Sequence, residues 1–171
     1  MLLLSRMLHL PKPDNILLRK AALRRRPDHA LSRSPLAESL PVWHPVHPEH
    51  YSTAYDIALL LKYALHNDTF REVAESHFHS TPATNVHPDG ITYYSTMLKN
   101  MSDTSVTGGE ILGGKTGYTS EAGHCLASFA QIYGREYILV TAGAAADATG
   151  VPHILDAKTI YNRLGEAVAQ K

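Results

Sequence analysis

Cysteine is almost absent from this sequence of 171 residues, and so are long apolar runs. The single Cys125 excludes an internal disulfide, and its place in the apolar run of residues 125–130 predicts a buried small residue rather than a nucleophile. No stretch of 18 consecutive apolar residues occurs, so we expect no membrane-spanning helix. We also expect no secretory signal, because the leucine run at residues 2–4 is broken at Arg6 and His9.

Glycine is missing from the first half of the chain, since all 11 glycines lie from Gly90 onward. Residues 1–44 also lack Tyr and Phe, and they hold eight Lys/Arg against three Asp/Glu, whereas residues 45–171 hold eight against thirteen. This break predicts an atypical basic segment over 1–44, disordered or foreign to the domain, and a globular part over 45–171. A basic arm for nucleic acid or anionic lipid, or an Arg-rich transit sequence, are the functional alternatives for residues 1–44.

Helical periodicity begins shortly after residue 50. Thr53 and Asp56 form a capping-box pattern, and the apolar residues that follow have helical spacing, which predicts a helix over 53–66. A second capping pattern at residues 69–72 predicts a shorter helix that ends near residue 76. Two prolines and an Asp-Gly pair then predict a turn-rich connection up to about residue 100.

The C-terminal third reads as two strands and a helix. Residues 125–133 and 137–142 predict strands, joined as a hairpin through 134–136. Both strands are apolar on both faces, so we expect elements to cover the sheet on each side. An apolar stripe predicts a closing helix over 152–169, with members Ile154, Ala157, Tyr161, Leu164 and Val168.

The segment Gly113–Thr119 carries the strongest chemical signal, and two chemistries compete for it. Residues Gly109–Thr116 match the nucleotide-binding pattern G-x-x-x-x-G-K-[ST], which must follow a buried strand and open a helix. The residues before it are polar and rich in turn formers, and those after it lack a helical period. This setting favours the alternative, a Lys-Thr-Gly strand of the kind found in penicillin-binding serine enzymes.

Four stretches in fixed order carry a family resemblance: His50–Asp56, Pro82–Asn85, Gly113–Tyr118 and Ala122–Ala127. Over about residues 48–168 the sequence resembles the serine D-alanyl-D-alanine carboxypeptidases, the low-molecular-weight penicillin-binding proteins. The resemblance implies an α+β fold, with a β-lactamase/transpeptidase-like antiparallel sheet and flanking helices. It also implies hydrolysis of peptidoglycan stem peptides ending in D-Ala-D-Ala through an acyl-enzyme, inhibition by β-lactams, and work outside the cytoplasmic membrane, often with an anchor.

The same resemblance assigns roles to four consecutive residues. Lys115 would face the substrate carboxylate and the catalytic groups, and the Thr116 hydroxyl would donate to that carboxylate. Gly117 would let the substrate pair along the strand edge, which a Cβ would block. The backbone N–H of Tyr118 would be one oxyanion donor.

Two family motifs are absent from the sequence, namely Ser-x-x-Lys and Ser-x-Asn. None of the ten serines upstream of Lys115 has Lys three residues on or Asn two residues on. Thr96–Lys99 has the first spacing with threonine, but it lies beyond the segment where the family keeps its nucleophile. We therefore expect the C-terminal part of a catalytic domain, without its N-terminal strands and nucleophile helix, and inactive alone.

Eleven histidines offer a metal-binding alternative. His44, His47 and His50 are spaced by three, and His77 and His79 by two, and imidazole is a common ligand of transition metals. His44 and His47 each precede a proline, which indicates an extended linker, and no Cys or acidic residue joins them at a zinc spacing. We expect solvated loop histidines, no metal, no cofactor and no nucleic-acid partner.

Overall fold

The computed structural model describes residues 15–18 and 52–170. Within them, five strands form one sheet in the order β1-β7-β6-β5-β4. These strands are β1 (Asn15–Leu18), β4 (Ser105–Val106), β5 (Gly109–Thr119), β6 (Gly123–Ile132) and β7 (Arg135–Ala144). Strand β1 runs parallel to β7, and the other neighbouring pairs are antiparallel.

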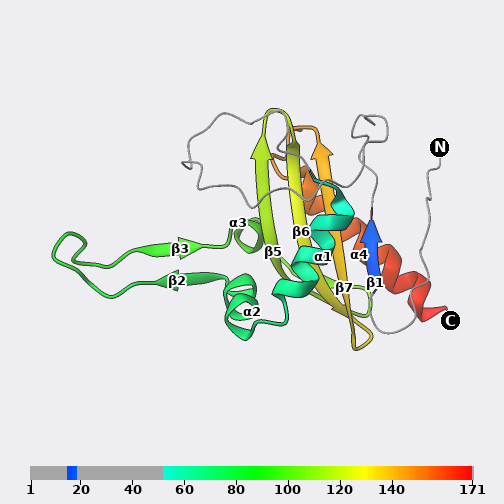
Figure 1. Ribbon diagram of the computed structural model, residues 1–171, viewed down its shortest axis with the longest axis horizontal. Coiled ribbons are helices and arrows are strands. Elements are labelled where there is room, and N and C mark those ends of the chain that lie inside the picture. The colour runs from blue at the N-terminus through cyan, green and yellow to red at the C-terminus, as the bar shows by residue number, and fades with distance from the viewer. Residues whose placement is uncertain (1–14, 19–51, 171) are drawn as a thin grey trace, which may run out of the picture.

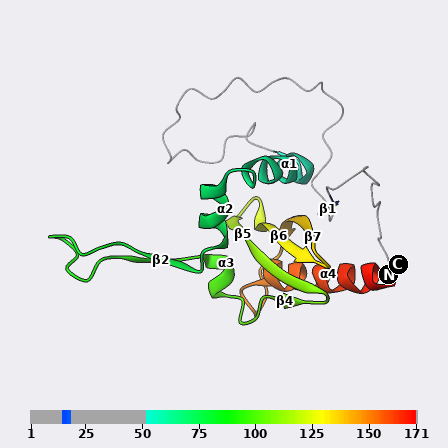
Figure 2. The same ribbon diagram turned by 90° about the horizontal axis from the view of Figure 1, so that it is seen from below.

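Helices cover both faces of this sheet, as Figure 2 shows with α1 (Ala54–Ala64) on one side and α4 (Pro152–Ala169) on the other. Strand β7 shows how one sequence serves both faces, because side chains alternate along a strand. Ile138 and Val140 pack in the cluster of α1, whereas Tyr137 and Leu139 pack in the cluster of α4. The expectation of an apolar sheet covered on each side is confirmed.

Capping groups begin the two helices that precede the sheet. The Thr53 hydroxyl accepts from the N–H of Asp56 at 3.0 Å, and the Asp56 carboxylate bonds back to Thr53, so the predicted capping box starts α1. Helix α2 (Asp68–Glu75) begins at Asn67, whose side-chain oxygen accepts from the N–H of Phe70 at 2.9 Å. The three predicted helices are thus present, but the capping pattern predicted at residues 69–72 is wrong, because Thr69 is already the second residue of α2.

The connection after α2 is more ordered than the sequence predicts. It contains β2 (Phe78–Ser80) and β3 (Thr92–Tyr94), paired antiparallel, and the short helix α3 (Thr96–Lys99). We call β2, β3 and the chain between them the arm; Figure 1 shows that it projects away from the sheet. Every residue of its two strands is exposed, so no buried face imposes the alternation by which strands are recognised.

The turn between β6 and β7 begins one residue earlier than predicted and ends two residues earlier. Tyr133 and Gly134 form it, with φ of +47° and +74°, and Arg135 already pairs with Ile132. Positive φ at both central residues is the geometry that matches the twist of a two-residue hairpin. The prediction of a turn over 134–136 is therefore wrong by this shift.

Of the basic segment 1–44, the structure describes only the strand Asn15–Leu18, which pairs with Tyr137–Val140 of β7. The boundary at residue 44 stays a prediction, and the opening leucine run and most of the Arg-rich stretch lie outside the described residues. Among the helices α1 to α4, none is both long enough and apolar enough to cross a bilayer.

Candidate functional site

The outer edge of β5 is open over most of its length. Strand β4 pairs only with Gly109 and Glu110, and the N–H of Ile111 donates to the carbonyl of Thr104. Beyond Ile111, no strand in the described part of the chain pairs with this edge. An unpaired edge of this kind presents backbone donors and acceptors to an extended chain.

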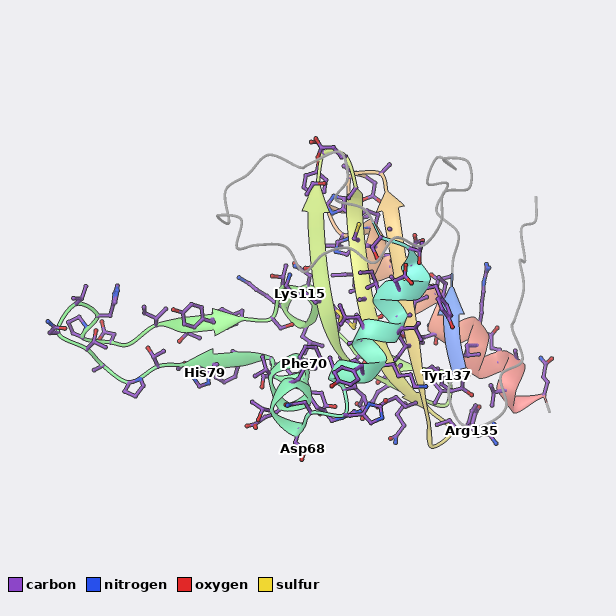
Figure 3. The ribbon with its side chains drawn as sticks, viewed as in Figure 1. Asp68, Phe70, His79, Lys115, Arg135 and Tyr137 are labelled. Carbon is purple, nitrogen blue, oxygen red and sulfur yellow. The ribbon has the colours of Figure 1, made fainter. Side chains whose placement is uncertain are left out.

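Lys115 lies midway along this open edge (Figure 3). It pairs across the sheet with Ala127, which packs in the cluster of α1, so Lys115 lies on the α1 face. Its side chain is exposed, and its Nζ donates to the carbonyl oxygen of Thr116. The site therefore holds a cation within reach of solvent at the strand edge.

Thr116 and Tyr118 lie on the opposite face, because strand residues alternate. Thr116 pairs with Leu126, a member of the α4 cluster, and is only 9 % exposed. Tyr118 is 62 % exposed, and its ring lies 4.6 Å from that of its cross-strand partner, His124. The structure thus brings the four predicted site residues onto one strand edge, with Lys115 and Thr116 directed to different faces.

The glycines of β5 divide into two kinds when a Cβ is placed on each. A Cβ at Gly113 would lie 2.3 Å from the carbonyl oxygen of Ala74 in α2, and one at Gly114 would lie 2.5 Å from the carbonyl oxygen of Ala127. Packing therefore requires glycine at both positions. A Cβ at Gly117 would meet nothing within 4 Å. Packing within the described residues therefore gives no reason for glycine at this position.

Cys125 is half-buried, and the prediction of a buried cysteine is wrong. Its cross-strand partner is Gly117, which has no side chain to cover it. The thiol lies 3.4 Å from the carbonyl oxygen of Ala122 and 3.6 Å from that of Gly123.

A stack of three rings, which no sequence pattern indicated, lies where β5 ends. The ring of His124 lies between Tyr118 and His153 of α4, with its centroid 5.0 Å from that of His153 and the two imidazole planes 12° apart. His153 is buried, and its Nδ1 has no hydrogen-bond partner in the part of the chain that the structure describes. Burial lowers the pKa of His153 below its ordinary value, and the charge of His124 lowers it further.

The nucleotide-binding alternative does not fit this geometry. Gly109–Thr116 is extended strand, and the chain continues through Gly117–Thr119 into the turn before β6. A phosphate cradle needs a loop that opens a helix.

The histidine alternative finds no cluster in the part of the chain that the structure describes, where no three His, Cys, Asp or Glu residues converge as metal ligands. His77 precedes the arm, and His79 is an exposed residue of β2. His44, His47 and His50 lie outside the described residues.

The Thr-x-x-Lys spacing of Thr96–Lys99 falls on α3, which packs against β5. Lys99 is directed to the arm, because its Nζ lies 5.1 Å from the ring centroid of Tyr94.

Comparisons with known proteins show the family and the fold of the chain. Residues 45–146 match the sequence family Peptidase_S11, described as D-alanyl-D-alanine carboxypeptidase. No curated protein matches the chain in sequence. The fold is similar to the crystal structure of D-alanyl-D-alanine carboxypeptidase from Mycobacterium tuberculosis H37Rv, with a TM-score of 0.51 and 21% identity. The match covers 65% of this chain and 39% of that structure, so the chain spans about two fifths of its length.

Proposed function

The chain belongs to the D-alanyl-D-alanine carboxypeptidase family, and we propose that it supplies the substrate-binding half of such an enzyme. In this proposal, the open edge of β5 binds a peptidoglycan stem peptide ending in D-Ala-D-Ala. The complete enzyme would remove the terminal residue through an acyl-enzyme on a serine. The family is associated with the cell envelope, which is where we propose that such an enzyme acts.

The observation that carries the proposal is the contrast between Gly117 and the two glycines before it. Gly113 and Gly114 are held by close backbone neighbours, whereas Gly117 faces open space beside an unpaired strand edge. An extended peptide adds to such an edge through main-chain hydrogen bonds, and it approaches most closely where no Cβ intervenes. Gly117 is therefore suited to a strand-like ligand.

The charges and donors around this edge fit a peptide with a free C-terminus. Lys115 supplies a positive charge on one side of the edge, and the Thr116 hydroxyl supplies a donor on the other. A carboxylate bound to charged and neutral donors together is held more strongly than by a neutral group alone. The N–H of Tyr118 would serve as one oxyanion donor during acyl transfer.

The chain by itself would bind without cleaving. No serine of the sequence upstream of Lys115 has a lysine one helical turn away, so the activated nucleophile is missing. Loss of a nucleophile removes about six orders of magnitude in turnover. A fluorescent penicillin should leave the purified chain unlabelled, and a label on one serine would show that the chain has its own nucleophile.

The binding half of the proposal can be tested with an N-acylated peptide ending in D-Ala-D-Ala, titrated by calorimetry or NMR. We expect binding that is lost when the peptide ends in an amide, because Lys115 and Thr116 then lack their carboxylate. Gly117→Ala should weaken binding while leaving the melting temperature unchanged, since its Cβ meets no neighbour.

Lys115→Ala should also weaken binding. Arg163→Ala, which removes an exposed cation of α4, is the matched control and should bind as the unaltered chain does. The proposed carboxylate-binding role of Lys115 and Thr116 would be contradicted if the amide peptide bound as tightly as the free acid. Equal losses of affinity in the Lys115 and Arg163 variants would contradict it too.

A further inference from the structure

Two imidazoles join the end of the substrate-binding strand to α4. His124 stands at the start of β6, directly opposite Tyr118 of β5. His153 stands in the first turn of α4, and the two rings lie face to face at 5.0 Å. The Tyr118 ring continues the stack at 4.6 Å, so three elements meet through three rings.

The surroundings of His153 disfavour a positive charge for four reasons. Its side chain is buried, its Nδ1 has no partner among the described residues, and its nearest aromatic neighbour is another imidazole. It is also the second residue of α4, where the partial positive charge of a helix N-terminus repels a cation. Protonating both rings would place two positive charges face to face.

Charged groups near the pair act in the opposite direction. Asp156, one turn further along α4, favours protonation of His153, and Asp147, in the loop before α4, is close enough to His124 for a charge interaction. For His153, burial is the largest effect and the charge of His124 the second, so the net direction of its pKa is downward despite Asp156. A neutral His153 is therefore the favoured state near neutral pH.

We propose that His124 and His153 form a proton-sensitive positioning pair that holds the carboxyl end of β5 against α4. With both imidazoles neutral, the stack fixes Tyr118 and so the backbone that follows Gly117. When acid charges the pair, repulsion separates the rings and frees the end of β5. The functional meaning rests on the proposed role of this strand, since Tyr118 carries the proposed oxyanion N–H.

The direction of the pH effect follows from linkage. The folded pKa of His153 lies below its unfolded value, so the unfolded chain binds more protons between the two. The stability that the neutral ring contributes is fully present above the unfolded pKa, about 6.5, and is lost as the pH falls through the folded pKa. The pair should therefore loosen on the acid side of neutrality.

The test is an NMR titration of the uniformly 15N-labelled chain from about pH 7.5 to about pH 5, with melting temperatures measured over the same range. In the unaltered chain, the Gly117 and Tyr118 amide peaks should shift with one shared midpoint, and the melting temperature should fall toward acid. Both changes should be clearly smaller in His153→Phe, which keeps an aromatic ring but cannot be charged.

His124→Phe is the second variant, and it removes the facing charge from a more exposed position. It should flatten the same two titrations even if His153→Phe packs poorly. His79→Phe, on the exposed strand β2, is the matched control and should titrate as the unaltered chain does.

The proposal would be overturned if the amide peaks of Gly117 and Tyr118 did not respond to pH, or if they shifted in both stack variants as much as in the unaltered chain. No substrate is present in this experiment. Failure of the stem peptide to bind therefore leaves its outcome unaffected, and the two proposals fail separately.

Discussion

The sheet and the arm contain similar aromatic residues, but the sheet buries its phenylalanine and the arm leaves its phenylalanine exposed. Phe129 of β6 is fully buried between α1 and the sheet, with the Arg71 guanidinium 5.4 Å from its ring centroid. Phe78 of β2 is 62 % exposed, and its ring neighbour is Tyr94, at 6.2 Å, which is itself exposed. Position relative to α1 and α4, rather than residue type, decides which aromatic side chains stabilise the fold. The proposed site lies on β5, the strand that is contacted by α2 and α3, the two helices that flank the arm.

The largest expected difference between the two regions comes from truncating one phenylalanine in each. Phe129→Ala should lower the free energy of unfolding by about 3–5 kcal/mol, because it leaves a cavity in a packed cluster. Phe78→Ala should cost about 1 kcal/mol or less, the value of an exposed cross-strand pair. Urea denaturation measures both, and similar losses would mean that the arm is part of the cooperative core.

Two glycines of β5 allow a packed position and an open position to be compared within a single strand. Gly113→Ala should destabilise the chain by about 1–3 kcal/mol, because its Cβ would press on the carbonyl of Ala74 in α2. Gly117→Ala should leave the unfolding free energy unchanged. If thermal melts show that Gly117→Ala is the more destabilising of the two, the open space beside Gly117 is filled in solution, and its assignment to a ligand fails.

An ion pair joins α2, the helix that precedes the arm, to β7 of the sheet, and its contribution to stability can be measured. Arg71 contacts both carboxylate oxygens of Glu136, at 2.7 Å and 3.2 Å, and both side chains are about one third exposed. Solvent screens such a pair, so Glu136→Gln should cost only about 0.5–1 kcal/mol, and less at high salt. Glu110→Gln, at an exposed position of β5, is the control and should show no salt-dependent loss in the same denaturation series.

The smallest effect concerns the acid side of the stability curve. The N–H of Ser105 and the Lys158 ammonium hold the Asp103 carboxylate, and together they lower the pKa of Asp103 to about 2. Because the folded pKa is below the unfolded one, the stabilisation is present above about pH 4 and is lost as the pH falls through about 2. Asp103→Asn should flatten this part of the pH–stability curve, and an unchanged curve would contradict the role given to Asp103.

The sheet and its helices were predictable because burial leaves a periodic trace in the sequence. The stripe from Ile154 to Val168 indicates α4, and the capping box at Thr53 indicates the start of α1. The Lys-Thr-Gly strand was also predictable, since turn formers surround it. These elements are recognised from contacts that recur every two to four residues.

The rest was not predictable, for two physical reasons. Strands β2 and β3 are exposed on both faces and flanked by Pro and Gly, so they carry no alternation. The stack of His124 on His153 joins residues 29 positions apart that meet only when α4 packs on the sheet. Local sequence patterns do not predict a contact between residues so far apart in the chain.

The register shift in β5 has a consequence for the site. Ile111 pairs with Ala130 and Gly113 with Phe129, so Leu112 is an extra residue with no partner of its own. Before Leu112, odd-numbered residues turn toward α4; after it, even-numbered residues do, since Ile111 and Leu126 share the α4 cluster while Ala127 packs with α1. The extra residue Leu112 thus decides which face of the sheet each later residue of β5 occupies. If Leu112 instead paired with Phe129, without the bulge, Lys115 would pair with Leu126 on the α4 face and Thr116 with Cys125, so the two residues would exchange faces.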